Sequence, residues 1–253
     1  MKKHWMFLGA LALVGCGQVE EQKSSSKIVN GSITESGTAV ALHTVALTQS
    51  GRPYCTGVLV DEDLVLTAAH CVEGTSRATV SFGLGVDGTP VDEITGQTVA
   101  HPDFDAGSIG RVQVGSDIGM ILLDEDAPSF MEPVAIATAN EYQEGDTVTL
   151  AGYGLLGYSG WWIFKSPIQN DGNRLRQTQT SISDITGDLI TFDTPNNGTN
   201  SSCRGDSGGP MYISNGNSVR LIGVTSYGPG QCDQGSGVYT SVPFHLDWIA
   251  DNS

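Results

Sequence analysis

The sequence predicts an all-β fold made of many short antiparallel strands. Its 253 residues include 33 glycines, and only 16% of them are charged. The apolar runs are short, and clusters of Gly, Asn, Asp and Ser separate them at intervals of roughly ten residues. Short strands bounded by turn signals at this spacing are typical of a β-sandwich or β-barrel, and a chain of this length can bury a substantial core.

The predicted strands are short apolar runs between turn-forming residues. They cover residues 44–49, 56–60, 64–69, 78–82, 119–123, 146–154, 188–192, 218–228 and 237–242. Only residues 244–252 have helical spacing, which makes Phe244, Leu246, Trp248 and Ile249 available for one buried face. The chain is therefore expected to end in a short helix.

The N-terminus resembles an export signal. Lys2 and Lys3 precede an apolar run over residues 5–14, which is too short to span a membrane permanently. The run leads into the sequence LVGC, which resembles the lipobox of bacterial lipoproteins, in which the cysteine, here Cys16, is lipidated and begins the mature chain. A buried helix of the folded domain is the less favoured alternative.

These features predict three parts of the chain. Residues 1–15 are expected to be a lipoprotein signal peptide, residues 16–27 a polar, Ser-rich tether, and residues 28–253 the folded domain. The precursor would be exported and held at the bacterial cell envelope only through the lipid on Cys16.

The cysteine count predicts two disulfides. Besides Cys16 the chain has an even set of four cysteines, as is usual for disulfide-bonded exported proteins. Counting leaves three pairings open. Proximity in sequence favours Cys55 with Cys71 and Cys203 with Cys232, each bridge stabilising the fold by about 3 kcal/mol. A cysteine metal site is disfavoured because the chain has no CxxC pair, and no metal is expected.

The charge argues against a nucleic-acid partner. The chain has 12 Lys and Arg residues against 28 Asp and Glu residues, a formal net charge of −16. A strongly acidic surface repels the phosphate backbone of DNA and RNA, whereas it favours solubility and cationic partners.

Three short motifs supply the groups for nucleophilic catalysis. LTAAHC contains His70, SDIGMILL contains Asp117, and GDSGGP contains Ser207. A serine hydroxyl is a poor nucleophile at neutral pH, so it needs an imidazole to take its proton and a carboxylate to hold that imidazole in the right tautomer. The three motifs together predict a Ser-His-Asp triad that needs no cofactor.

On these motifs the chain resembles the trypsin-like (chymotrypsin-fold) serine endopeptidases from Ile28 to its C-terminus. The resemblance implies two six-stranded antiparallel β-barrels with the active site in the cleft between them and a short C-terminal helix packed on the body. The first barrel would carry His70 and Asp117, and the second would carry Ser207. It also implies protein or peptide substrates and an acyl-enzyme intermediate, and we expect a monomer.

The sequence Lys27-Ile-Val-Asn-Gly resembles the activation site of these zymogens. The resemblance implies that an activating protease cuts after Lys27, so that the new α-ammonium of Ile28 pairs with Asp206. Losing one partner of a buried ion pair costs about 3 to 5 kcal/mol, so the pair would order the loop around Ser207. The N–H groups of Gly205 and Ser207 would then form the oxyanion hole. The same cut would release the domain from its lipid anchor.

The resemblance also indicates which residues contact the substrate. Ser201 would lie at the base of the specificity pocket, Gly228 and Gly237 would leave room on its walls, and Tyr227 would pack beside the substrate. The backbone at Ser226 and Gly228 would pair with the substrate as an added strand. An uncharged, open pocket favours large apolar residues before the scissile bond. The alternative is an Arg or Lys preference created by Asp233.

Two other functions remain open at this point. One is a catalytically silent protease fold that acts as a binding module, and the other is an esterase that uses the same triad. The other histidines of the predicted folded domain, His43, His101 and His245, lie outside the catalytic motifs, and no catalytic role is predicted for them.

Overall fold

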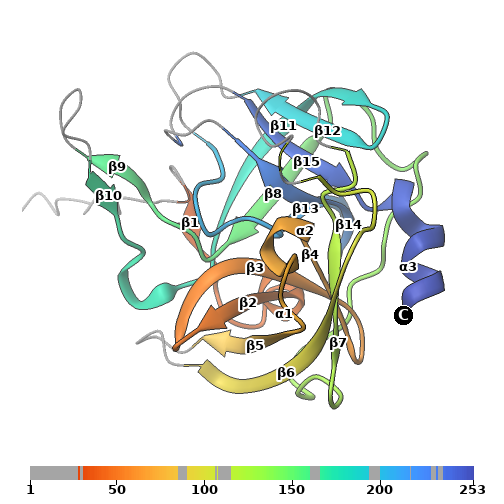
Figure 1. Cartoon of the computed structure of the whole chain (residues 1–253). Helices are drawn as coiled ribbons and strands as arrows, with labels where there is room; N and C mark the ends of the chain where they lie inside the picture. Colours follow the sequence, from red (N-terminus) through yellow and green to blue (C-terminus); the bar gives the residue numbers. More distant parts are fainter. Residues whose placement is uncertain are drawn as a thin grey trace, which may run out of the picture.

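The computed structural model describes residues 28, 31–84, 90–105, 107, 115–159, 166–193, 200–216, 218–228, 232 and 236–253. Two antiparallel β-barrels lie side by side, one built from the N-terminal half of the described chain and the other from the C-terminal half (Figure 1). The predicted fold class is therefore confirmed. Cys16 and the predicted signal and tether, residues 1–27, lie outside the described residues.

The first barrel closes because its last strand in spatial order pairs with its first. The strands, in spatial order, are β2 (Thr44–Gln49), β3 (Arg52–Asp61), β4 (Leu64–Thr67), β7 (Gly119–Leu123), β6 (Pro90–Ala100) and β5 (Arg77–Leu84). Leu47, Leu59, Val65, Val80 and Phe82 fill its interior and are fully buried. Two short helices, α1 (Ala39–His43) and α2 (Ala69–Val72), flank these strands.

The second barrel closes through two pairings of one strand. Its members, in spatial order, are β8 (Thr147–Gly152), β11 (Arg176–Thr186), β12 (Leu189–Asp193), β15 (Ser236–Ser241), β14 (Ser218–Tyr227) and β13 (Pro210–Asn215). Strand β8 pairs with β11 on one side and with β13 on the other. Three smaller strands and a 3₁₀ turn are peripheral: β1 (Ser32–Ile33) on the edge of β11, the hairpin of β9 (Gly157–Ser159) and β10 (Ser166–Ile168), and η2 (Asp171–Asn173).

A shared hydrophobic core joins the two barrels. Leu66 and Met120 of the first barrel and Tyr212 and Val224 of the second belong to one cluster of buried side chains. The Tyr212 hydroxyl also lies 3.1 Å from the Thr44 hydroxyl across this junction. Interiors packed in this way resist deformation, so residues contributed by different barrels keep fixed relative positions.

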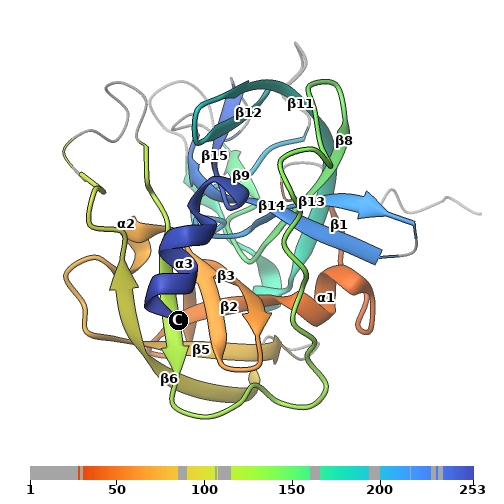
Figure 2. The same cartoon turned by 90° about the vertical axis from the view of Figure 1, so that its right-hand side faces the viewer.

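The C-terminus forms a 3₁₀ turn, η3 (Pro243–His245), and a helix, α3 (Leu246–Asn252), which lies along one side of the molecule (Figure 2). The helix is confirmed, but the predicted buried face is only partly right. Ile249 is buried and Trp248 packs on His101, whereas Phe244 is 62% exposed and Leu246 41% exposed. The break between the 3₁₀ turn and the α-helix separates Phe244 from the face that Ile249 occupies.

All nine predicted strand segments correspond to strands of the structure. The sequence does not predict the barrel strands β6, β11 and β13 or the short peripheral strands β1, β9 and β10. Among the described helices, none combines the length and the hydrophobicity needed to cross a lipid bilayer.

Candidate active site

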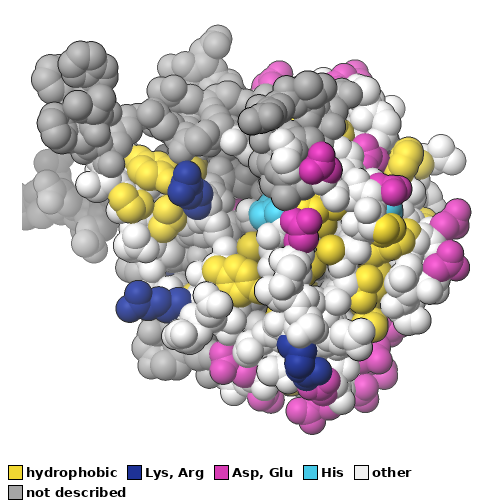
Figure 3. Space-filling view, viewed as in Figure 1, with side chains coloured by type: hydrophobic (Ala, Val, Ile, Leu, Met, Phe, Trp, Pro, Cys, Tyr) yellow, Lys and Arg dark blue, Asp and Glu magenta, His cyan; other side chains and the backbone are white. Residues whose placement is uncertain are grey.

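Two hydrogen bonds join His70 and Asp117, both from the first barrel. His70 lies on α2, and Asp117 lies in the turn before β7. His70 Nδ1 lies 2.9 Å from Asp117 Oδ2, and the His70 backbone N–H donates to Asp117 Oδ1 at 3.0 Å. Asp117 is fully buried, whereas 23% of the His70 side chain is exposed. Figure 3 shows that histidine atoms reach this face of the molecule among hydrophobic and acidic side chains.

The environment keeps the Asp117 carboxyl ionised. Burial raises its pKa, but hydrogen bonding and charge from the His70 ring, a 2.5 Å hydrogen bond from the Ser226 hydroxyl and the His70 backbone N–H together lower that pKa below its ordinary value. Because an ionised carboxylate can only accept hydrogen bonds, Nδ1 must be the donor. The neutral imidazole therefore leaves Nε2 free to accept a proton.

Ser207 comes from the second barrel, and backbone contacts hold it against the first. Its carbonyl accepts a hydrogen bond from the Thr56 N–H at 2.8 Å, and the same oxygen lies 3.7 Å from Cys71 Sγ, one residue after His70. Within the described chain, Ser207 Oγ makes no hydrogen bond with His70 Nε2. Such contacts are often loose in the absence of substrate. The structure therefore brings the three predicted catalytic residues to one place, with only the His70–Asp117 pair hydrogen-bonded.

A hydrogen bond from Leu155 orients the backbone of the loop before Ser207. The Arg204 carbonyl accepts a hydrogen bond from the Leu155 N–H at 2.8 Å. Since the carbonyl and N–H of a trans peptide point in opposite directions, the Gly205 N–H faces away from Leu155. Gly205 has a φ of 95°, which favours glycine. In the described chain, neither the Gly205 N–H nor the Ser207 N–H donates to another backbone group.

Asp206, between these two residues, is a buried carboxyl without a cationic partner among the described residues. It accepts hydrogen bonds from the Gly154 N–H at 2.8 Å and the Cys203 N–H at 2.7 Å. Burial raises its pKa to about 7, although these two hydrogen bonds act in the opposite direction. A Cβ atom on Gly154 would lie 2.7 Å from the Asp206 carboxyl carbon, so the carboxyl can be accommodated only beside a glycine.

The Ile28 side chain is buried, with only 2% of the residue exposed, and its carbonyl accepts a hydrogen bond from the Gly31 N–H. Lys27 and the two residues between Ile28 and Gly31 lie outside the described residues. The structure therefore encloses the side chain at the predicted new N-terminus within the fold.

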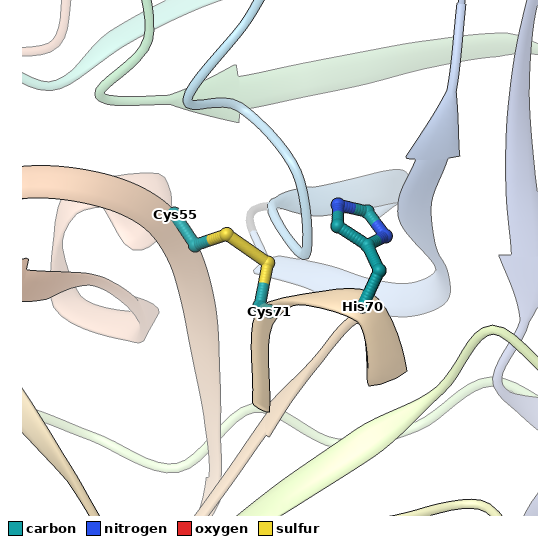
Figure 4. Close-up of side chains that lie close together, drawn as sticks. All are labelled: Cys55, His70 and Cys71. Atoms are coloured by element: carbon teal, nitrogen blue, oxygen red, sulfur yellow. A yellow bond between two sulfur atoms is a disulfide. The ribbon is translucent and has the colours of Figure 1, made fainter. Parts of the chain in front are cut away.

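Both predicted disulfides are present. Cys55 is bonded to Cys71, and Cys203 is bonded to Cys232. The first bridge lies beside the ring of His70 (Figure 4). These three side chains bring their potential ligand atoms within 4.8 Å of one another. The two sulfurs are already bonded to each other, however, and zinc needs free thiolates, so the cluster is not a metal site in this form.

Four of the predicted substrate-binding residues belong to β14 and β15 or adjoin them: Ser226, Tyr227, Gly228 and Gly237. The pairing register of β14 with β15 shifts between Thr225 and Tyr227, so Ser226 has no partner residue on β15. The Ser226 hydroxyl donates a hydrogen bond to Asp117 instead. Tyr227 is partly exposed and packs with Ala69 and Phe104 next to His70. Partial burial raises the pKa of the Tyr227 phenol.

The base of the predicted pocket is uncharged and closed. Ser201 is fully buried, and its hydroxyl donates to the Ser202 carbonyl at 3.1 Å. The Ser202 side chain hydrogen-bonds to Tyr239, whose hydroxyl pKa is raised mainly by burial. Ser201 thus belongs to a polar cluster under β15.

Comparisons with known proteins show the family to which this chain belongs. The family model described as Trypsin matches residues 28–249. The chain belongs to the trypsin family. It is accordingly a serine endopeptidase, and the curated relatives that it matches include two proteins of Drosophila melanogaster named Serine protease 1 and Serine protease 2.

The similarity to individual members of the trypsin family is moderate and extends along most of the chain. Serine protease 1 of Drosophila melanogaster is 28% identical over 249 residues, which cover 90% of this chain and 86% of that protein. Vitamin K-dependent protein C of Mus musculus is 27% identical over 257 residues, covering 91% of this chain and 52% of the relative. The solved structure of neuropsin, a serine protease expressed in the limbic system of mouse brain, superposes with a TM-score of 0.70 at 26% identity, covering 87% of this chain and 97% of that one.

One expectation about the pocket of this trypsin-family protease is wrong. The sequence predicts open space beside both Gly228 and Gly237. A Cβ on Gly228 would indeed meet only the Gly237 Cα at 3.9 Å, but a Cβ on Gly237 would lie 2.4 Å from the ring of Phe192. Phe192 is the cross-strand partner of Gly237, so its ring occupies the space that the missing side chain leaves. Asp233, the residue of the alternative specificity, lies outside the described residues.

Sequence reasoning misses several residues that support the site. The Thr56 hydroxyl donates to the Gly205 carbonyl at 2.9 Å and accepts from the Tyr153 N–H at 3.2 Å, and so links β3 to the loop before Ser207. The only signal for Thr56 is its place next to Cys55 in a predicted apolar strand. Asp188 contacts the turn before Asp117, His245 contacts Asp188, and no local motif identifies either of them.

Proposed function

We propose that this trypsin-family endopeptidase is made as an exported zymogen, is activated by cleavage after Lys27, and hydrolyses peptide bonds through Ser207, His70 and Asp117. The observation that carries the proposal is the double hydrogen bond between His70 and the buried, ionised Asp117, beside a serine held from the other barrel. This arrangement supplies a nucleophile, a base and a carboxylate in fixed relative positions.

In the first half of the proposed reaction, Ser207 Oγ attacks the carbonyl carbon of the substrate while His70 Nε2 takes the hydroxyl proton. Asp117 keeps the proton of Nδ1 in place and stabilises the positive charge that develops on the imidazole. The proton then passes from Nε2 to the departing amine, which leaves an acyl-enzyme. In the second half, water attacks the acyl group, His70 again takes the proton, and Ser207 is released.

The N–H groups of Gly205 and Ser207 would stabilise the negative oxygen in both halves. The support is that the Arg204 carbonyl is turned toward Leu155, so the Gly205 N–H points the other way, and neither N–H has a backbone acceptor among the described residues. Losing one such donor costs about 2.7 to 4 kcal/mol of activation free energy. The proposed reaction requires no cofactor or metal ion.

Activation would supply the cation that Asp206 lacks. In the uncut chain this carboxyl is buried with two backbone hydrogen bonds, and its pKa is raised to about 7. The α-ammonium formed at Ile28 would pair with it and keep it ionised. The burial of the Ile28 side chain supports this step, because only the new amino group would then have to move into place.

The proposed location follows from the N-terminal segment and the disulfides. The signal over residues 1–15 would direct export, and a lipid on Cys16 would hold the precursor at the bacterial envelope until cleavage after Lys27 releases the domain. Two disulfides in the folded domain fit an oxidising compartment. The enzyme would act as a monomer on protein or peptide substrates, with an activating protease as its other partner.

For specificity we propose large apolar residues before the scissile bond. Ser201 carries no charge, and the space beside Gly228 is open. The backbone of Ser226, free of β15, and that of Gly228 would pair with the substrate as an added strand. An Arg or Lys preference through Asp233 is the alternative.

The test uses the proform cut after Lys27 in vitro, with Ile28 verified as its N-terminus. The cut enzyme, the uncut chain and the cut Ser207→Ala variant are profiled on a peptide library and labelled with a fluorophosphonate. We expect turnover and labelling only for the cut wild-type chain, with cleavage after Phe, Tyr, Leu or Met.

Two results would overturn parts of the proposal. Equal activity of the cut and uncut chains would remove the zymogen step. Cleavage after Arg or Lys would keep the triad and replace Ser201 by Asp233 as the specificity determinant.

A further inference from the structure

The backbone immediately before Asp117 is held in an unfavourable conformation. Ser116 has a φ of 61°, and only three non-glycine residues of the described chain have a positive φ. Side chains other than Gly, Asn and Asp rarely adopt this left-handed conformation. Such outliers persist only where surrounding contacts enforce them, and they gather at functional sites.

A carboxylate from the other barrel enforces this conformation. The Ser116 N–H donates to Asp188 Oδ2 at 2.6 Å, a short, charge-assisted hydrogen bond. Asp188 lies in the turn between β11 and β12, and its own carbonyl accepts from the Ser241 N–H at 2.7 Å. The contact therefore connects the turn before Asp117 to a rigid part of the second barrel.

A buried histidine in turn holds the carboxylate. His245 Nε2 lies 3.3 Å from the same oxygen of Asp188, and only 5% of His245 is exposed. The hydrogen bond from His245, and that from Ser116, lower the pKa of Asp188 despite its partial burial, so Asp188 is ionised. His245 packs edge to face against His101, with ring centroids 5.0 Å apart.

The turn passes this constraint to Asp117. The Ser116 carbonyl accepts from the Ile118 N–H at 2.8 Å, and the Ile118 carbonyl accepts from the His101 N–H at 3.0 Å. Asp117 thus lies in a tight turn that is hydrogen-bonded to His101, directly after β6, on one side and to Asp188 on the other. A rotation of the Ser116 peptide would move the Asp117 carboxylate away from the two N–H groups of His70.

We propose that Asp188 and His245 form a positioning pair that holds Asp117 in its orientation toward His70. The inference rests on the proposed role of Asp117. It adds one residue from the second barrel and one from the C-terminal segment to the residues that position the proposed triad. It predicts that the chemical step depends on Asp188, although Asp188 contacts neither substrate nor triad side chain.

The test measures kcat and KM of activated variants, with active-site titration to count competent enzyme. We expect Asp188→Ala to lower kcat at least ten-fold with KM within two-fold, Asp188→Asn to lower kcat less, and His245→Leu to resemble Asp188→Ala. His245→Gln, whose side-chain amide can still donate to Asp188, should retain most of the activity. Asp184→Asn is the matched control, because this exposed carboxyl on the same hairpin bonds only to the nearby Thr186 hydroxyl.

The decisive experiment repeats Asp188→Asn and His245→Leu in an Asp117→Asn background. If the pair acts through Asp117, these changes should lower kcat by less than two-fold there. Equal losses in both backgrounds, or full activity of Asp188→Asn and His245→Leu in the wild-type background, would overturn the inference. Full activity of Asp117→Asn alone would instead overturn the proposed triad, so the two failures are distinguishable. Asp188→Asn and His245→Leu keep the test valid if Asp188→Ala does not fold.

Discussion

Two buried aspartates, Asp117 and Asp206, lie near the barrel junction, and their surroundings shift their pKa values in opposite directions. Asp117 receives hydrogen bonds from the His70 ring, the His70 backbone and the Ser226 hydroxyl, and its pKa is lowered. Among the described residues Asp206 receives only two backbone hydrogen bonds, and burial raises its pKa to about 7.

The comparison shows what burial alone does to a carboxylate and what a partner changes. Burial disfavours the charged form at both positions. Among the described residues, only Asp117 has a neighbouring side chain, the His70 ring, that can carry the opposite charge. Asp117 therefore already has its partner in the uncut chain, whereas Asp206 has no cationic partner among the described residues. In the proposed zymogen, this difference would be the physical basis for regulating the enzyme through the N-terminus.

The largest effect, a loss of kcat, is expected from replacing Asp117. In serine proteases, replacing the triad Asp by Asn lowers kcat by about 10⁴-fold because the imidazole adopts the wrong tautomer. We expect a loss of the same order for Asp117→Asn in the cut enzyme, measured as kcat on a peptide substrate. Asp126→Asn, at an exposed position a few residues further on, is the control and should leave kcat unchanged.

The second effect concerns Asp206 and the pH dependence of stability. A group whose folded pKa is raised from 3.8 to about 7 stabilises the fold fully below about pH 4, and that contribution is lost as pH rises through about 7. At about 1.4 kcal/mol per pKa unit, the loss amounts to about 4 kcal/mol in the free energy of unfolding.

The measurement compares denaturant unfolding of the uncut Ser207→Ala chain from pH 4 to 8 with that of the same chain carrying Asp206→Asn. The free energy of unfolding of the Ser207→Ala chain, relative to that of the chain that also carries Asp206→Asn, should fall by about 4 kcal/mol as the pH rises from 4 to 8. Cutting after Lys27 should abolish most of the fall, because the α-ammonium keeps Asp206 ionised. An identical pH slope with and without Asp206 would show that the uncut chain does not bury this carboxylate.

The third effect concerns the hydroxyl that supports the loop containing Asp206. Thr56→Val keeps the shape of the side chain but leaves the Gly205 carbonyl and the Tyr153 N–H without a partner in a fully buried site. Each buried unsatisfied group costs about 1 to 3 kcal/mol. We expect a lower Tm and, if Gly205 supplies an oxyanion-hole N–H as proposed, a lower kcat, whereas Thr56→Ser should retain both. If Thr56→Val left kcat unchanged, the Thr56 hydroxyl would not be needed to position the Gly205 N–H.

The sequence predicts the parts of this site that short motifs carry. His70, Asp117 and Ser207, the two disulfides and the strands rich in Val, Ile and Leu can all be identified from local patterns. Strand β11 is missed because it alternates Thr, Gln and Ser, and its inward positions include Thr178, which a hydropathy pattern does not distinguish from a loop.

The remainder depends on contacts between distant parts of the chain. Asp188 reaches Ser116 across 72 positions, and the left-handed backbone of Ser116 leaves no mark in the sequence. Phe192 fills the space beside Gly237 only because β12 and β15 pair in one particular register.

The smallest effect on kcat and Tm is expected at Asp124, a carboxylate that has a charged partner but is not buried. Asp124 is bonded to Arg77 and accepts from the Thr95 hydroxyl, and these contacts lower its pKa, as contacts do for Asp117. Asp124 is exposed, however, so solvent and salt screen its charge, and exposed ion pairs contribute little to stability. Asp124→Asn should therefore leave kcat unchanged and shift the Tm by no more than Asp126→Asn does. A clear drop in Tm that disappears at high salt would mean that pairing stabilises a carboxylate here even without burial.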